Sequence, residues 1–420
     1  MLTFWSGQST RTCGGMSRRG FLRIGGLGVG GLTLAQMLDP KLKAETPQRA
    51  KSVIMICLFG GPPQLDTYDL KPDAPSDYRG EFQPIKTNVP GVDICELFPL
   101  QAKMWDKLAV IRSVVAGQSD HRDQETHTGF VKGRPCFGSV ISKVRGVNSA
   151  GVPPFVNLRF ESSGLDPTYL GVAHRAFSPR GPGLQNLGLR ENFPVERLHE
   201  RRDLLHGFDT LRRDIDSSGV MNGMDALQSR AVDIVLSGEV RRALDVSRVD
   251  LRTRERYKGV EQFLTARRLV EAGVGAVTMD VGNWDTHFDN FKYCREWLPK
   301  IDRGLSNLIS DLHDLGLDKD VITVMWGEFG RTPKINNRGG RDHWDRVMST
   351  VIAGGGLKMG QAIGSTSARA EEPKSRPYRV PQVLSTIYQA IGIDPSRTFP
   401  DGNGRPMHIL DDREQVSELI

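Results

Sequence analysis

The chain has 420 residues, enough for one large domain or two small ones with a substantial buried core. Its 38% hydrophobic and 25% charged residues are typical of a globular protein and exclude a disordered or fibrous one. The net charge of +6 lies mostly in residues 1–50, which hold seven of the 56 basic but two of the 50 acidic residues. The remaining charges nearly balance, so the composition argues against a nucleic-acid partner.

The N-terminus predicts export. Ser17, Arg18 and Arg19 are followed by Phe21 and Leu22, and then by a glycine-rich apolar run over residues 24–38. This run is shorter than the roughly 20 residues of a membrane-spanning helix, so it reads as a twin-arginine signal peptide rather than an anchor. An amphipathic helix with two chance arginines is the alternative.

We therefore predict a leader over residues 1–44 and passage through the twin-arginine translocase to the periplasm or the cell exterior. Cleavage near Ala44 is expected, although an uncleaved leader that retains the protein is the alternative. We predict no transmembrane span in the mature chain.

The five cysteines carry little functional information. Cys13 lies in the leader, and the other four show no metal-binding spacing. Cys57 lies in an apolar run and is expected in the core. An oxidising compartment would allow a disulfide, but the sequence does not require one.

Six short β-branched runs bounded by glycine, proline or aspartate predict buried strands. They cover residues 53–59, 108–113, 155–160, 276–281, 321–326 and 347–353. Continuous apolar runs of this kind indicate a parallel sheet covered on both faces, and the segments between them can hold helices. The predicted fold class is α/β.

Helical periodicity is clearest between residues 191 and 272, where two or three helices, forming a projecting cap, are expected. The apolar positions with helical spacing are Ala231, Ile234, Val235, Phe263, Ala266, Leu269 and Val270. Further helices are predicted over residues 295–315 and 381–391, the latter with a proline in its first turn. Loops are expected over 60–100, 161–190 and 331–342. We predict one domain over residues 50–415 with a helical insertion at about 191–272.

Polar side chains cluster just after the predicted strands, where open α/β sheets bind ligands. Seven of them can bind a metal: Asp66, His121, Asp285, His287, Glu328, Asp342 and His343. A mixture of carboxylates and imidazoles suits zinc, manganese or iron, whereas oxygen ligands alone would suit calcium or magnesium. The set is large enough for two ions about 4 Å apart, as in phosphoryl-transfer enzymes.

Each candidate also has a structural interpretation. Asp66 follows a Gly-Gly-Pro-Pro turn and could be a turn or cap residue. Asp285 and His287 could cap the following helix, and Glu328 could pair with Arg331. His127 is a weaker metal candidate than His121.

Several blocks in order resemble a large family of twin-arginine-exported bacterial proteins, domain of unknown function 1501, within the alkaline phosphatase and sulfatase superfamily. The blocks are residues 60–69 (GGPPQLDTYD), the segment around His121, residues 282–287, residues 327–333 and residues 341–343. The resemblance implies a three-layer α/β/α sandwich with a mostly parallel sheet, and one or two divalent ions at its strand ends. Zinc is favoured, with manganese, iron or calcium as alternatives.

The resemblance also implies roles for individual residues. Asp66 would follow the first strand as a ligand, Asp285 and His287 would be the central ligands, and Glu328, Asp342 and His343 the later ones. The sequence departs from better-known members in the one-residue gap between Asp285 and His287, in Glu328 in place of an Asp-His pair, and in lacking the sulfatase Cys-x-Pro-x-Arg signature. These departures leave the number of metals open.

Superfamily enzymes place a hydroxyl or modified cysteine nucleophile at a helix N-terminus. Ser119 is the candidate here, with Thr126 and Thr128 as alternatives, although Ser119 could be only a helix cap. Arg122 and Arg331 could bind an anionic ester oxygen or form structural ion pairs.

The sequence thus predicts an exported, metal-dependent hydrolase of phosphate or sulfate esters, with polysaccharide among the possible substrates. Ser119 or a metal-activated water would attack the ester. The alternatives are a non-catalytic surface-binding or assembly protein that keeps the fold, and, ranked last, a phosphoryl-transferring mutase.

Overall fold

The computed structural model describes residues 51–121, 124–146, 151–159, 164–180, 200 and 231–420. Its centre is a mixed sheet with the strand order β11-β4-β10-β7-β1-β6-β5, in which β14 also pairs with β4. The strands are β1 (Ser52–Cys57), β4 (Leu108–Val115), β5 (Phe155–Asn157), β6 (Ala276–Asp280), β7 (Val321–Trp326), β10 (Met348–Gly354), β11 (Gln361–Ile363) and β14 (Tyr378–Arg379). All six predicted strands are confirmed, although β5 ends earlier than expected.

The sheet is mostly parallel, as predicted. β1 is parallel to β6 and β7, and β6 is parallel to β5. β10 is the exception, because it runs antiparallel to both β7 and β4. The carboxyl ends of β4 and β7 therefore lie at the same edge of the sheet as those of β1 and β6.

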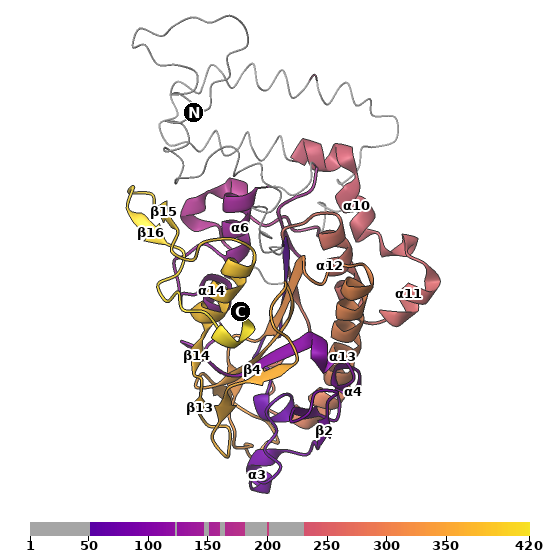
Figure 1. Ribbon diagram of the computed structural model, residues 1–420, viewed down its shortest axis with the longest axis vertical. Helices are drawn as coiled ribbons and strands as arrows, with labels where there is room; N and C mark the ends of the chain where they lie inside the picture. Colours follow the sequence, from indigo (N-terminus) through magenta and orange to yellow (C-terminus); the bar gives the residue numbers. More distant parts are fainter. Residues whose placement is uncertain (1–50, 122–123, 147–150, 160–163, 181–199, 201–230) are drawn as a thin grey trace, which may run out of the picture. The chain divides into compact units, whose positions relative to one another are not determined.

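Helices cover both faces of the sheet and complete a three-layer sandwich (Figure 1). Ile54 and Ile56 of β1 belong to the hydrophobic cluster that includes α12 (Glu261–Glu271) and α13 (Asn290–Asp314). Val53 and Met55 belong to the other cluster, with α6 (Phe137–Arg145) and α14 (Val380–Ala390). This alternation explains why β1 is apolar from Val53 to Cys57, since both sides of the strand are buried.

The two discrete helices predicted from sequence correspond to α13 and α14, and Pro381 lies in the first turn of α14 as expected. α12 packs directly on β1 and β6. This helix is therefore part of a sandwich layer rather than of a projecting cap. α10 (Glu239–Leu244) and α11 (Leu251–Arg256) precede it, with α10 packed on α12. The rest of the predicted insertion, residues 191–199 and 201–230, lies outside the described residues, as does the predicted leader.

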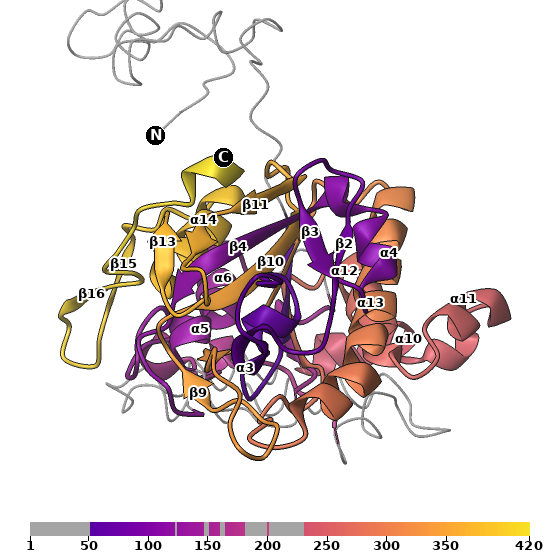
Figure 2. The ribbon, with the colours of Figure 1, turned by 90° about the horizontal axis from the view of Figure 1, so that it is seen from below.

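The segments predicted as loops contain short elements (Figure 2). Between β1 and β4 lie η1 (Gln64–Asp66), α3 (Ser76–Arg79), the β2–β3 hairpin (Pro84–Lys86, Asp93–Cys95), α4 (Pro99–Ala102) and η2 (Trp105–Lys107). The remaining short elements of the described chain, inside and outside the predicted loops, are α5 (Gln124–Thr128), η3 (Thr168–Leu170), η4 (Val172–His174), η5 (Val246–Arg248), η6 (Ser417–Leu419) and three strand pairs. The pairs are β8–β9 (Gly330–Arg331, His343–Trp344), β12–β13 (Ser365–Thr366, Pro373–Ser375) and β15–β16 (Thr398–Pro400, Pro406–His408).

The four cysteines in the described part of the chain are buried and unbridged. Cys57 faces the core as predicted. Among the described helices, none combines the length and the apolar character needed to span a bilayer.

Candidate metal centre

The carboxyl edge of the sheet brings together side chains from four distant segments. Asp285 follows β6, Glu328 follows β7, His343 lies in β9, and His121 follows β4. Because β4, β6 and β7 all end at this edge, residues more than 220 positions apart in the sequence become neighbours. The sequence-based expectation that strand-end residues converge is met for these four.

The turn after β1 packs directly against Asp285 and Glu328. Gly60 adopts φ +101° and lies so close to Asp285 that a Cβ atom there would come within 2.3 Å of the Asp285 backbone nitrogen. Its own amide donates a 2.8 Å hydrogen bond to Oε1 of the buried Glu328. Only glycine tolerates both the positive φ and this close approach. The Gly-Gly-Pro-Pro turn thus fixes the backbone on which Asp285 sits.

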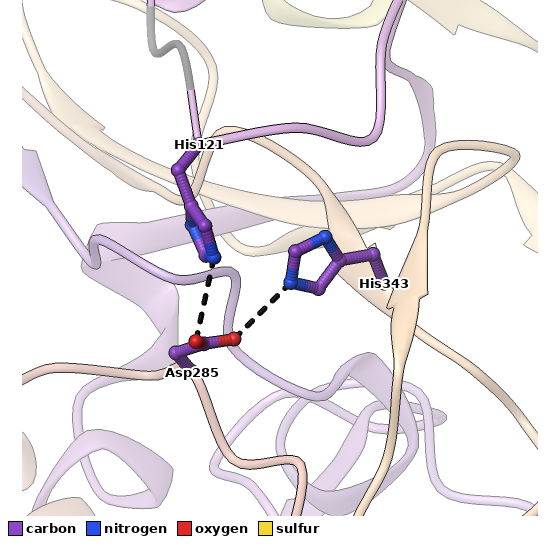
Figure 3. A group of neighbouring side chains, drawn as sticks. All are labelled: His121, Asp285 and His343. Carbon is purple, nitrogen blue, oxygen red and sulfur yellow. Dashed lines mark hydrogen bonds and ion pairs between the residues drawn. The ribbon is translucent and has the colours of Figure 1, made fainter.

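His121, Asp285 and His343 form a group whose potential ligand atoms all lie within 4.8 Å of one another (Figure 3). Oδ2 of Asp285 lies 3.4 Å from Nε2 of His121, and Oδ1 lies 3.1 Å from Nε2 of His343. His287 adjoins the group, with its Nε2 3.0 Å from Oδ1 of Asp285 and 3.1 Å from Nε2 of His343. A tetrahedral zinc site with bonds of about 2.0–2.1 Å requires ligand separations of about 3.3 Å. The spacing therefore fits a single ion.

The tautomers of the three imidazoles are fixed by the hydrogen-bond partners of their Nδ1 atoms, the ring nitrogens that do not face Asp285. Nδ1 of His287 lies 2.6 Å from a carboxylate oxygen of Asp342, and Nδ1 of His343 lies 2.7 Å from the Ser119 carbonyl oxygen. Nδ1 of His121 lies 3.2 Å from Oε1 of Glu328. Carbonyl and ionised carboxylate oxygens only accept hydrogen bonds, so each Nδ1 is the donor.

In the neutral imidazoles, each Nε2 atom then carries a lone pair that faces the Asp285 carboxylate. Two such lone pairs, on His287 and His343, face each other across 3.1 Å. Acceptors that converge without a donor repel one another unless a cation lies among them. The donor set therefore fits a divalent metal ion, with the imidazole and carboxylate ligands that zinc, manganese and iron accept.

The electrostatics keep the central carboxylate ionised. Burial raises the pKa of Asp285, but the hydrogen bond from Arg331 and the positive charge of this guanidinium group outweigh burial and lower the pKa to about 2. A hydrogen bond to Glu328 raises the pKa of His121 against the opposing effect of its partial burial. At neutral pH the site offers a negatively charged ligand to a cation.

Arg331 lies at this site but does not face solvent. Its guanidinium group is fully buried and donates to Oδ1 of Asp285 at 2.8 Å. It also donates to the carbonyl oxygens of Gly61, Arg341 and Gly60. With its nitrogens occupied in this way, Arg331 supports the site rather than presenting a charge to a substrate. Arg331 pairs with Asp285 rather than with Glu328, the partner considered from the sequence. Glu328 instead accepts a hydrogen bond from the Gly60 amide and lies against Nδ1 of His121.

Asp66 is placed differently from the other predicted ligands. Its carboxylate is fully buried, accepts two hydrogen bonds from Arg341 at 2.8 and 3.0 Å, and accepts a third from Asn290 at 2.8 Å. Asp66 does not belong to the group of ligand atoms around Asp285. We therefore leave Asp66 out of the proposed ligand set.

The predicted nucleophiles differ in access. Ser119 is exposed in the loop after β4, beside His343, and does not begin a helix. Thr126 and Thr128 are buried in α5, and the hydroxyl group of Thr128 bonds the backbone of Gln124 and Phe130. Arg122 lies outside the described residues. His127, the weaker metal candidate, is buried beside Cys57 and Arg159 instead.

Asn336 is a site residue that the sequence reasoning did not single out. Its amide nitrogen donates to the His287 carbonyl oxygen at 3.0 Å and to both Asp342 oxygens at 3.3 and 3.4 Å. Its side-chain oxygen accepts from the amides of Arg338 and Gly340 and so closes the turn. The Asn-Asn-Arg-Gly-Gly run was the signal available, because asparagine followed by glycines predicts such a side-chain-closed turn.

Fold and site together define an α/β/α sandwich with a potential divalent-metal site at the carboxyl edge of its sheet. The chain matches, over residues 50–420, the family described as protein of unknown function (DUF1501), and it belongs to this family. This finding confirms the family that the sequence blocks resemble. No curated protein matches.

Solved structures with similarity to the chain include sulfatases and phosphatases. PsFucS1 sulfatase from Pseudoalteromonas sp. is 12% identical with a TM-score of 0.37, over 82% of this chain and 68% of that one. Alkaline phosphatase from the Antarctic bacterium TAB5 is 12% identical with a TM-score of 0.34, over 82% and 98%. The periplasmic domain of EcEptC from Escherichia coli, in complex with Zn, is 10% identical with a TM-score of 0.36, over 89% and 92%.

Proposed function

We propose that the protein is an exported, metal-dependent hydrolase of phosphate or sulfate esters. The observation that carries the proposal is the convergence of three imidazole Nε2 atoms and a carboxylate held at low pKa, with an exposed serine beside them. The proposed ligands are His121, Asp285, His287 and His343. Zinc is favoured, with manganese or iron as alternatives.

A divalent ion at this position would polarise the ester and stabilise the negative charge that develops on its oxygens. The protein residues orient this chemistry. Arg331 and Gly60 hold Asp285, and the Nδ1 partners hold the imidazole rings. Ser119 supplies a hydroxyl group that solvent reaches, on the loop whose backbone also holds His343. Among the three predicted nucleophiles, this access favours Ser119 as the attacking group.

The leader predicted over residues 1–44 supports export through the twin-arginine translocase. In this proposal the substrate is an extracellular or periplasmic anionic ester, with sulfated or phosphorylated polysaccharide as the first class to screen. Arg331 is buried and bonded to Asp285, so we do not assign the anionic oxygen to it. Arg122, the other arginine predicted to bind that oxygen, lies outside the described residues and stays a candidate.

The deciding experiment measures metal content and hydrolysis in the same protein samples. Wild type purified without chelators is expected to hold a transition metal and to cleave aryl phosphate or aryl sulfate esters. His343→Ala should lose both, whereas His313→Ala, on the far end of α13, should lose neither. Metal binding without any ester cleavage would instead favour the non-catalytic surface-binding protein.

Ser119→Ala tests the nucleophile separately. If Ser119 attacks, this variant keeps its metal but loses turnover by several orders of magnitude. Unchanged hydrolysis in Ser119→Ala, and in Thr126→Ala and Thr128→Ala, would show that water is the attacking group.

A further inference from the structure

We infer that Asp342 is not a metal ligand but a positioning residue, which holds His287 in the tautomer and orientation that a single-ion centre needs. This inference rests on the metal-binding part of the proposed function and not on the ester chemistry. It departs from the sequence-based expectation, in which Asp342 binds a metal alongside His343.

The first argument is the direction of the contact. Asp342 Oδ1 lies 2.6 Å from Nδ1 of His287, the nitrogen opposite the one that faces Asp285 and His343. The imidazole ring therefore stands between the carboxylate and the cluster. Metal-bound histidines commonly donate their second nitrogen to a carboxylate in this way, which fixes the tautomer and makes the ligating nitrogen more basic.

The second argument is that Asp342 is itself held in place. Its oxygens accept from the Asn336 side chain, and its backbone amide donates to the Thr332 hydroxyl group at 2.9 Å. Asn336 also bonds the His287 carbonyl oxygen, so one amide group ties together both ends of the Asp342–His287 contact.

The third argument is close packing between this turn and His287. A Cβ atom at Gly340 would come within 2.2 Å of the His287 carbonyl carbon and oxygen, so position 340 has no room for a side chain. The Asn336–Asp342 segment therefore lies directly against the backbone of His287, and its carboxylate is aimed at one ring nitrogen. This packing explains why a carboxylate that is half exposed still meets His287 at 2.6 Å.

The same pattern recurs at the other two rings with different acceptors. The Ser119 carbonyl oxygen takes the Nδ1 proton of His343, and Glu328 takes that of His121. Glu328, like Asp342, thus lies on the outer side of an imidazole. Removing these two carboxylates from the ligand set leaves three histidines and Asp285, which suffice for one ion. The centre is mononuclear in this assignment.

The test is a titration of chelator-treated full-length protein with Zn²⁺, and separately with Mn²⁺, against a competing indicator dye. Wild type should bind one equivalent. Asp342→Ala should still bind one equivalent, about 10- to 100-fold more weakly, as is typical for loss of such a partner. Asp342→Asn should fall between them, because an amide oxygen still accepts the Nδ1 proton but carries no charge. Asn336→Ala, which leaves the carboxylate in place, should weaken binding less than Asp342→Ala.

Asp289→Asn is the matched control. It removes the same charge two residues from His287, and asparagine tolerates the φ of +49° found there. Its affinity should stay within about twofold of wild type.

A second readout does not depend on metal. In the metal-free protein, long-range ¹H–¹⁵N spectra should show His287 protonated on Nδ1 in wild type and shifted toward the Nε2-protonated form in Asp342→Ala. Two equivalents in wild type that fall to one in Asp342→Ala would overturn the inference, as would an Nε2-protonated His287 in wild type. Wild type that binds no metal would instead refute the proposed function.

Discussion

The buried guanidinium group of Arg331 donates a 2.8 Å hydrogen bond to Oδ1 of Asp285, the carboxylate oxygen that also faces His287 and His343. The same side chain bonds the carbonyl oxygens of Gly60, Gly61 and Arg341. Arg331 thus joins the turn after β1, the end of β6 and the segment before β9 at a single group.

We expect Arg331→Met to destabilise the metal-free protein by about 3–5 kcal/mol, because it leaves three carbonyl oxygens and the partly exposed Asp285 carboxylate without their donor. Urea unfolding followed by circular dichroism measures this change. Arg338→Met, at an exposed position in the neighbouring turn, should change the free energy of unfolding by less than about 0.5 kcal/mol. Equal stability of the two variants would contradict the structural role assigned to Arg331.

Asp66→Asn separates a structural carboxylate from a metal ligand. Because Asp66 pairs with the buried Arg341, its neutralisation should cost about 3 kcal/mol of unfolding free energy while metal stoichiometry in the folded protein stays unchanged. Metal analysis on the folded fraction, with the exposed Asp77→Asn as control, decides the matter. Loss of metal from folded Asp66→Asn would reinstate Asp66 as the ligand predicted from sequence.

Stability should fall between about pH 4 and pH 6 through Asp302. Burial raises the pKa of this carboxyl group from 3.8 to about 6, despite hydrogen bonds from the backbone amides of Gln101 and Leu100. The folded state then binds the proton more tightly than the unfolded state, so this stabilisation is complete below pH 3.8 and is lost as the pH rises through 6. At about 1.4 kcal/mol per pKa unit, the loss is about 3 kcal/mol.

Urea unfolding at pH 4.5, 5.5 and 6.5 measures this slope. Asp302→Asn should flatten it relative to wild type, whereas Asp314→Asn, exposed at the end of the same helix α13, should not. A slope unaltered in Asp302→Asn would assign the pH dependence to other groups.

The described cysteines should be inert in the folded protein. Burial raises the pKa of Cys95 to about 12 and that of Cys136 to about 11, so almost no thiolate forms at neutral pH. Native protein should react with Ellman's reagent at these positions only on unfolding, and dithiothreitol should leave the melting temperature unchanged. Rapid modification of a thiol in the folded mature chain would contradict this.

The sequence predicted the fold more completely than it predicted the site. β1 and β7 are almost wholly apolar on both faces, so burial on both sides could be inferred from composition alone. The local sequence of β10 does not predict its antiparallel direction. A strand buried on both faces has the same apolar pattern whichever way it runs.

At the site, strand-end position predicted which residues would gather but not which atom of each would face inward. Asp342 and His343 are neighbours in sequence, yet one lies behind the ring of His287 and the other faces Asp285. Asp66 follows a strand, as Asp285 and Glu328 do, but its carboxylate is paired with the buried Arg341, which is distant in sequence. These differences depend on side-chain partners that only the tertiary structure brings together.

The sequence separation of the proposed ligands ties metal capture to complete folding. No ion can be held by all four ligands until the chain has been made past His343 and β4, β6 and β7 have paired through β1 and β10. An ion that binds only the native state adds its binding free energy to the stability of the whole sheet. The melting temperature of the full domain should therefore rise with the concentration of free metal ion, and should differ between buffers that hold this concentration at different values.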